Sequence, residues 1–151
     1  MKIRFKKFKV VKSTNDIAIK LIKKNIIEPT LITAEKQTNG RGRIGKKWIS
    51  QKGNLFLTIF FRLEQKKLNF KQFAILNAFL VKNIISKMIS KNVSIKWPND
   101  LLFNKQKICG ILQEKISFNQ FSFLIVGIGL NTNIVPQNKK NALNLTGVRF
   151  F

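Results

Sequence analysis

Apolar and polar residues alternate along the first part of the chain, and their spacing then changes. From Ile3 to Val11 apolar side chains alternate with basic ones, a period of two that predicts a strand. Ser13 to Asp16 then offers residues that favour the first turn of a helix. A helix should therefore follow, and its buried stripe is expected to be formed by Ile17, Leu21 and Ile22.

The middle of the chain is predicted to hold two more strands and a long helix. One strand spans Thr30 to Lys36, and a second spans Asn54 to Leu63. The second is apolar on both faces, which is typical of a strand inside a sheet. From Phe70 to about Ser90 apolar residues recur at helical spacing, which predicts a helix that covers one sheet face. Its apolar stripe is expected to comprise Phe73, Leu76, Leu80, Ile84 and Met88, with Val81 and Ile85 beside them.

The remaining pattern predicts short strands joined by tight turns. Turns are expected at Asn104 to Gln106 and at Ser117 to Gln120, and a glycine-rich strand end is expected at Gly127 to Asn131. Strands joined by hairpins, together with two helices, favour an α+β fold with a mixed, largely antiparallel sheet. A chain of 151 residues that is 44% hydrophobic fits one domain with a single core.

The number of cysteines and the apolar segments indicate in which cellular compartment the protein is expected. The single cysteine, Cys109, leaves no intrachain disulfide framework, so we expect a cytoplasmic protein in a reducing compartment. The N-terminal residues contain no uninterrupted apolar run of the kind that export signals have. Three lysines and two asparagines interrupt the segment from Phe70 to Ile89, so no membrane span is expected there.

Charge raises the question of nucleic-acid binding. The formal net charge is +23, but lysine outnumbers arginine 24 to 5 and the lysines are spread along the chain. This distribution favours a solvated basic surface over a specific DNA-binding site, and a basic nucleic-acid-binding module remains an alternative. The chain has no histidine and no tyrosine, which excludes imidazole bases, Ser-His triads and histidine-ligated metals.

The first candidate site is the loop Gly40-Arg41-Gly42-Arg43-Ile44-Gly45. It matches the dinucleotide-binding pattern G-x-G-x-x-G, but that site needs a helix directly after the glycines, and here a strand is predicted. Glycines let a backbone approach an anionic ligand, and guanidinium groups bind phosphate or carboxylate in a bidentate manner. The loop is therefore a candidate anion site, and the alternative is a flexible basic loop.

The second candidate site is Lys96-Trp97-Pro98-Asn99-Asp100. Lys96 has apolar neighbours and precedes a bend imposed by Pro98, so its ammonium group can be held inside a pocket. The alternative is a lysine at the sheet edge beside a core tryptophan.

Together, the two segments resemble the biotin protein ligase family. Further matching pieces occur in the family's order: Ser13-Thr14-Asn15, Ala34-Glu35, Gln37, Lys47-Trp48, Asn54-Leu55, Lys107, Gly110-Ile111-Leu112, Glu114 and Gly127 to Asn131. The resemblance implies a catalytic fold like that of class II aminoacyl-tRNA synthetases. It also implies a reaction in two steps, in which biotin and ATP form biotinyl-5′-AMP and a lysine of a biotin carboxyl carrier protein then takes the biotinyl group.

The resemblance also implies roles for individual residues. Catalytic cations are expected at Lys96, Arg41 and Arg43. The biotin-binding residues are expected to be Ser13, Thr14, Asn15, Gln37, Gly40, Arg41, Gly42, Arg43, Lys96 and Gly110. The ATP-binding residues are expected to be Arg43, Lys96, Gly127, Gly129 and Asn131. Asp100 is a candidate for a role in the acceptor step, and Mg²⁺ is expected to come with ATP through its phosphate oxygens.

Two departures from the family pattern qualify these expectations. Lys46 stands where the family's loop commonly carries a third arginine, and the chain ends at Phe151. We therefore expect a catalytic domain over residues 1–151, without the N-terminal helix-turn-helix or the complete C-terminal β-barrel of longer members. No specific DNA binding and no membrane contact are expected, and a homodimer is possible. The alternatives are a lipoate-type ligase of the same fold and an inactive remnant.

Overall fold

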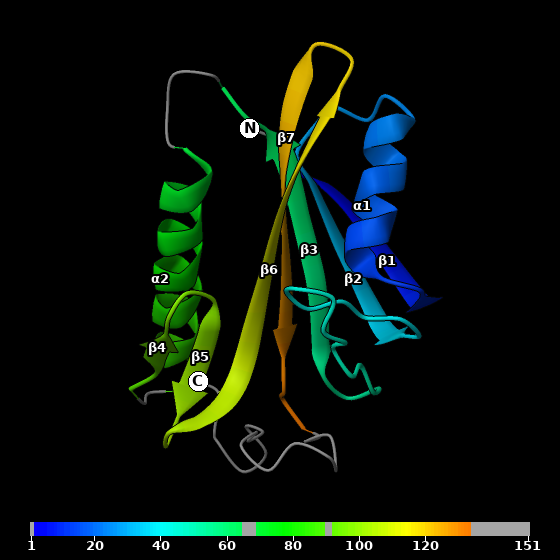
Figure 1. Ribbon diagram of the computed structural model, residues 1–151. Coiled ribbons are helices and arrows are strands. Elements are labelled where there is room, and N and C mark those ends of the chain that lie inside the picture. The colour runs from blue at the N-terminus through cyan, green and yellow to red at the C-terminus, as the bar shows by residue number, and fades with distance from the viewer. Residues whose placement is uncertain (1, 65–68, 90–91, 134–151) are drawn as a thin grey trace.

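The computed structural model describes residues 2–64, 69–89 and 92–133. Two helices and seven strands occupy these residues (Figure 1). In chain order they are β1 (Arg4–Val11), α1 (Thr14–Lys23), β2 (Thr30–Gln37), β3 (Leu55–Arg62), α2 (Phe70–Ile89), β4 (Ser94–Lys96), β5 (Asp100–Phe103), β6 (Gln106–Phe118) and β7 (Phe121–Leu130).

All seven strands form one sheet in the order β1-β2-β3-β7-β6-β5-β4. β1 and β2 are parallel and are connected through α1, whereas every other neighbouring pair is antiparallel. The predicted α+β fold with a mixed, largely antiparallel sheet is confirmed. β3 lies between β2 and β7, as expected for a strand that is apolar on both faces.

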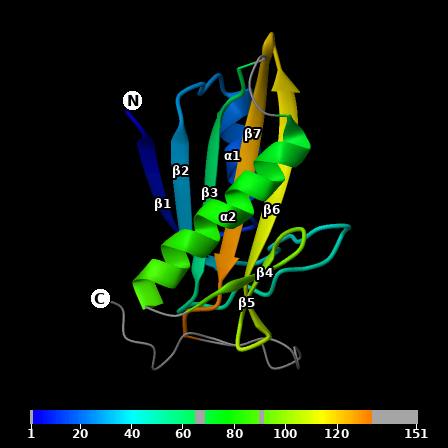
Figure 2. The ribbon, with the colours of Figure 1, turned by 90° about the vertical axis from the view of Figure 1, so that its left-hand side faces the viewer.

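The two helices cover opposite faces of the sheet, as Figures 1 and 2 show. On one face Ala18 and Ile22 of α1 pack with Phe60 and Phe123, whose rings meet edge to face at 6.5 Å. On the other face α2 packs over β5, β6 and β7 through a separate apolar cluster that contains Ile85. Residues Cys109 and Leu124 belong to that cluster, and burial raises the pKa of the Cys109 thiol to about 12. The thiol is therefore protonated and unreactive at neutral pH.

The face that α2 turns to the sheet differs from the predicted stripe. Phe73, Val81 and Ile85 pack on the core as expected, but Leu80, Ile84 and Met88 are exposed. Ala78 and Ile89, which the prediction left out, are buried together with Ile85. Because α2 is apolar on several sides, its sequence periodicity could not determine which side contacts the sheet.

The length and composition of α2 would also allow it to cross a membrane, as they would for a helix in the core of a soluble protein. In the structure, α2 packs against the sheet.

The predicted turns are confirmed. Asn104 and Lys105 both have positive φ in the hairpin between β5 and β6, and Asn119 has positive φ in the hairpin between β6 and β7. Between β2 and β3, residues 37–50 form a hairpin arm whose tip is turned by Ile44 and Gly45, both with positive φ. A strand and not a helix follows the arm, so the glycine pattern is not a dinucleotide-binding loop.

Candidate active site

A cavity of about 210 Å³ lies between the start of α1, the hairpin arm and the sheet. Its walls come from segments that are distant in sequence: α1, the arm, the turn before β5, β6 and β7. The residues lining it are Ser13, Thr14, Asn15, Gln37, Arg41, Gly42, Arg43, Ile44, Lys46, Lys47, Trp48, Asn99, Asp100, Lys107, Gly110, Ile111, Leu112, Gly127, Ile128 and Gly129.

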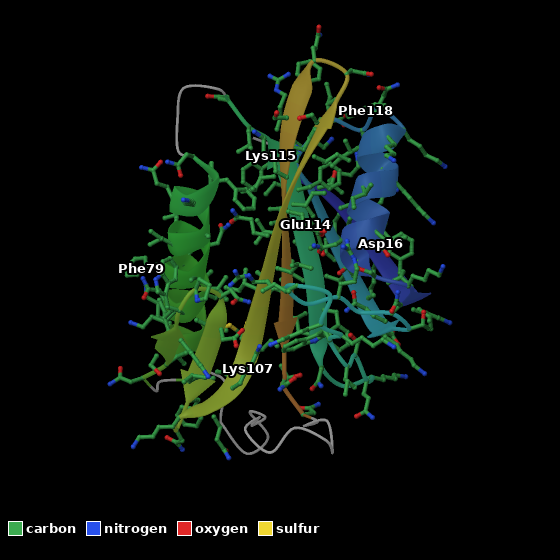
Figure 3. The ribbon with its side chains drawn as sticks, in the orientation of Figure 1. Asp16, Phe79, Lys107, Glu114, Lys115 and Phe118 are labelled. Carbon is green, nitrogen blue, oxygen red and sulfur yellow. The ribbon has the colours of Figure 1, made fainter. Side chains whose placement is uncertain are left out.

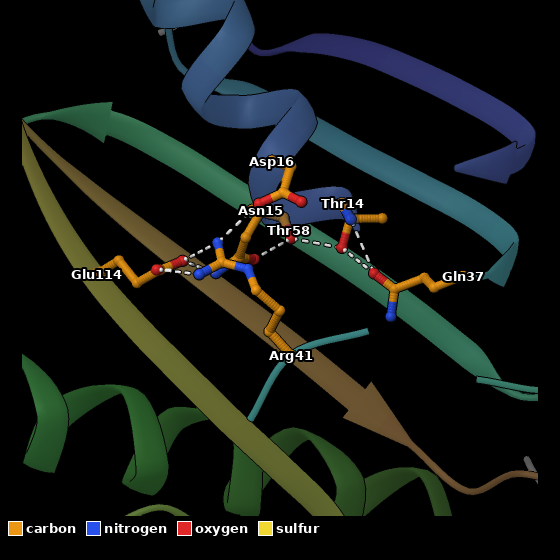
Figure 4. A network of polar contacts seen from close by, with 7 residues as sticks. All are labelled: Thr14, Asn15, Asp16, Gln37, Arg41, Thr58 and Glu114. Atoms are coloured by element: carbon orange, nitrogen blue, oxygen red, sulfur yellow. Dashed lines mark hydrogen bonds and ion pairs between the residues drawn. The ribbon is translucent and has the colours of Figure 1, made fainter. Parts of the chain in front are cut away.

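Neutral polar groups at the start of α1 form one wall of the cavity (Figure 4). The Gln37 side-chain oxygen accepts hydrogen bonds from the Thr14 amide at 2.8 Å and from the Thr14 hydroxyl at 3.0 Å. Thr58, which is fully buried in β3, donates to Asn15 Oδ1 at 2.6 Å and lies 2.8 Å from the Thr14 hydroxyl. These contacts fix the orientation of the donors and acceptors that face the cavity.

Arg41 lies beside this wall and is held by two carboxylates. Its Nη1 and Nη2 donate to both oxygens of Glu114 at 2.8 and 2.9 Å, and Nη2 also contacts Asp16 at 2.9 Å. Burial acts to lower the pKa of Arg41, but the hydrogen bonds and charges of Glu114 and Asp16 outweigh it and raise the pKa. The guanidinium group is therefore charged at neutral pH.

Trp48 fixes the base of the arm to the sheet. A side chain at Gly110 or Gly129 would overlap the Trp48 ring, so the two glycines on β6 and β7 create the surface on which the indole lies. At the tip, Arg43 Nη1 donates to Asn99 Oδ1 at 3.1 Å, which connects the arm to the turn before β5. The arm therefore covers the cavity from one side.

Lys107 of β6 forms the second charged feature of the cavity. Its Nζ lies 2.6 Å from Asp100 Oδ1 and 5.2 Å from the centre of the Trp48 ring. Asp100 is the acidic residue in the cavity lining. A lysine held between a carboxylate and an aromatic face is well placed to bind an anionic ligand.

Most residues predicted from the sequence line this cavity. They are Ser13, Thr14, Asn15, Gln37, Arg41, Gly42, Arg43, Asp100, Gly110, Gly127 and Gly129. Gly40 and Asn131 lie outside the lining. Gly40 packs tightly against Trp48 and Ser50 at the base of the arm. Asn131 is buried after β7, where its backbone N–H donates to the backbone carbonyl of Ile108.

Lys96 is also outside the cavity, contrary to the expected placement. It is exposed on β4, at the edge of the sheet and two strands away from β6. The lysines that line the cavity are Lys46, Lys47 and Lys107. The sequence contains 29 basic residues, and no local pattern distinguishes those that face the cavity from the others. The position of a lysine in the sheet depends on how the strands pair.

Sequence reasoning also missed the roles of Thr58 and Glu114. Thr58 was detectable, because a polar residue in the middle of an apolar strand needs a hydrogen-bond partner. Glu114 belongs to a motif piece that was recognised, but its contact with Arg41 joins residues 73 positions apart. Only the fold brings these two side chains together.

Most of the chain, including every residue that lines the cavity, matches a known protein family. A model of the biotin/lipoate A/B protein ligase family matches residues 7–131. The chain belongs to this family. The resemblance expected from the sequence motifs is confirmed.

The relatives of this family member include enzymes named for biotin ligation. The chain is 37% identical over 131 residues to the bifunctional ligase/repressor BirA of Bacillus subtilis, covering 85% of this chain and 40% of that protein. It is 32% identical over 127 residues to the biotin–[acetyl-CoA-carboxylase] ligase of Paracoccus denitrificans, covering 82% of this chain and 52% of that protein.

A similar fold occurs in the biotin protein ligase of Aquifex aeolicus in complex with biotin and ATP. The TM-score is 0.77 at 34% sequence identity, over 94% of this chain and 59% of that chain. The family member described here thus spans about 40 to 60% of the length of these three proteins.

Proposed function

We propose that the chain activates biotin with ATP to give biotinyl-5′-AMP and then transfers biotin to a lysine of a biotin carboxyl carrier protein. The observation that carries the proposal is the cavity itself, which combines fixed neutral hydrogen-bonding groups with cations from the arm and from β6. The relatives named for biotin ligation support the choice of biotin.

The first step requires positive charge, because the carboxylate of biotin and the triphosphate repel each other. Negative charge also accumulates on the α-phosphate oxygens as the carboxylate oxygen attacks phosphorus and pyrophosphate leaves. Arg43 and Lys107 both line the cavity and can stabilise this charge. Thr14, Asn15 and Gln37 offer neutral groups that suit the uncharged ureido ring of biotin.

Mg²⁺ is proposed to enter with ATP, held mainly by phosphate oxygens. Within residues 2–64, 69–89 and 92–133, no three His, Cys, Asp or Glu side chains lie close enough together to hold a metal ion. The proposed site of action is the cytoplasm, since the single thiol is buried and no disulfide is needed to hold the fold.

The decisive experiment is incubation of the chain with biotin, ATP and Mg²⁺, followed by mass spectrometry for biotinyl-5′-AMP. A parallel reaction with lipoate tests the other ligase type in this family. We expect the biotin adduct alone. A lipoyl adduct in place of it would favour the lipoate-type ligase, and the absence of both would favour an inactive remnant.

A further inference from the structure

Two of the six acidic residues of this strongly basic chain contact a single arginine of the arm. Asp16 projects from α1 and Glu114 from β6 (Figure 3), and the guanidinium group of Arg41 lies between them (Figure 4). Such an arrangement differs from that of a cation prepared for an anionic ligand, because the local charge of the three groups sums to −1.

The contacts leave little of the guanidinium group for a ligand. Glu114 accepts one hydrogen bond from Nη1 and one from Nη2 in a bidentate pair, and Asp16 Oδ1 lies 2.9 Å from Nη2 as an ion pair. The remaining edge nitrogen, Nε, is buried and has no hydrogen-bond partner in the described part of the chain. An incoming carboxylate or phosphate would have to displace Glu114 or Asp16 to obtain a paired contact.

Glu114 itself is firmly fixed. Its Oε2 accepts a hydrogen bond of 2.7 Å from Asn15 Nδ2, and Asn15 is buried and bonded to Thr58 of β3. The bidentate pair is thus connected to a buried network that includes α1, β3 and β6. Displacing Glu114 would leave buried polar groups unpaired, which is costly.

We propose that Arg41 is the anchor that fixes the hairpin arm to α1 and β6, and that Glu114 is the positioning residue that holds it there. On this proposal Arg41 shapes the cavity and contributes no charge to ligand binding, contrary to the catalytic role expected from the sequence. The charge for an anionic ligand then comes from Arg43 and Lys107. Arg43 is bound by one exposed hydrogen bond to Asn99, and Lys107 is paired with a single carboxylate.

A pair of ligands of similar shape, one charged and one neutral, tests the proposal, which for this purpose rests on the proposed function. Biotin carries a carboxylate, and its primary amide is neutral. Arg41→Met is expected to weaken binding of both by the same factor, about tenfold, because a loosened arm affects every ligand. Lys107→Met is expected to weaken biotin about tenfold more than the amide, because it removes a charge. A selective loss of biotin binding in Arg41→Met would overturn the proposal.

A second measurement needs no ligand. Hydrogen exchange should become faster at the arm amides of Gly42, Lys46 and Trp48, which are hydrogen-bonded in the structure, in both Arg41→Met and the isosteric Glu114→Gln. The matched control is Glu28→Gln, which breaks an exposed arginine–glutamate pair with Arg4 outside the cavity. Unchanged exchange in Glu114→Gln would refute the anchor. Failure of the unsubstituted protein to bind biotin would refute the proposed function alone.

Discussion

At the scale of single residues, the two lysines considered for catalysis occupy different environments. Lys107 lines the cavity between Asp100 and Trp48, whereas Lys96 is exposed on an edge strand. We expect Lys107→Met to slow formation of biotinyl-5′-AMP by about 10²-fold or more, since it removes charge where the transition state needs it. Lys96→Met is the matched control and should retain most of the activity. The rate of pyrophosphate release measures both, and the reverse order of effects would restore Lys96 as the catalytic cation.

Asp100 leads to a prediction about the acceptor step. The acceptor lysine must lose a proton before it attacks, because its free pKa is about 10.4. Asp100 is the carboxylate in the cavity lining, and it faces Lys107 at 2.6 Å. We expect Asp100→Asn to slow transfer to the acceptor more than adenylate formation. Single-turnover assays that start from preformed biotinyl-5′-AMP separate the two steps, and equal slowing of both would indicate a purely structural role.

At the scale of elements, the hairpin arm is the part of the site whose position matters most. Arg43 closes its tip onto the turn before β5 through Asn99. Removing this contact in Arg43→Gly should let the reactive adenylate escape, because a mixed anhydride must be shielded from water until the acceptor arrives. Biotinylation of bystander proteins should therefore increase.

Mass spectrometry of biotinylated lysines in a mixture of the acceptor and an unrelated protein measures this loss of specificity. Asn99→Ala removes the other partner of the same hydrogen bond and should produce a milder form of the effect. If Arg43→Gly labels the acceptor alone, the tip of the arm does not retain the adenylate.

The elements also differ in how well their sequences predicted them. The ends of β1, β2, β3 and α2 were expected within about one residue of their observed positions, because period and turn residues are local signals. The prediction of the α2 face that contacts the sheet was wrong in part. Leu80, Ile84 and Met88 are exposed although they are as apolar as the buried Ile85 and Ile89. Phe79, labelled in Figure 3, is also exposed on α2. Only the position of α2 relative to the sheet distinguishes these side chains.

At the scale of the whole molecule, the net charge of +23 should affect stability. Like charges repel more strongly in the folded state, where they lie closer together, and salt screens this repulsion. The midpoint of thermal unfolding should therefore rise between low salt and about 0.5 M sodium chloride. Circular dichroism provides the measurement. Replacing the exposed Lys7 and Lys9 by glutamine should reduce the salt dependence, and a midpoint that falls with salt would contradict the prediction.

The sequence by itself determined the α+β class, the order of elements, the central place of β3 and most residues of the cavity lining. It could do so because hydrophobic period, turn residues and the two motifs are properties of neighbouring positions along the chain. The tertiary structure decided which basic residues of the described part of the chain face the cavity, and it placed Lys107 in the lining and Lys96 outside it. It also brought Asp16, Arg41 and Glu114 together, since contacts between residues 25 and 73 positions apart depend on strand order and register, which no local pattern encodes.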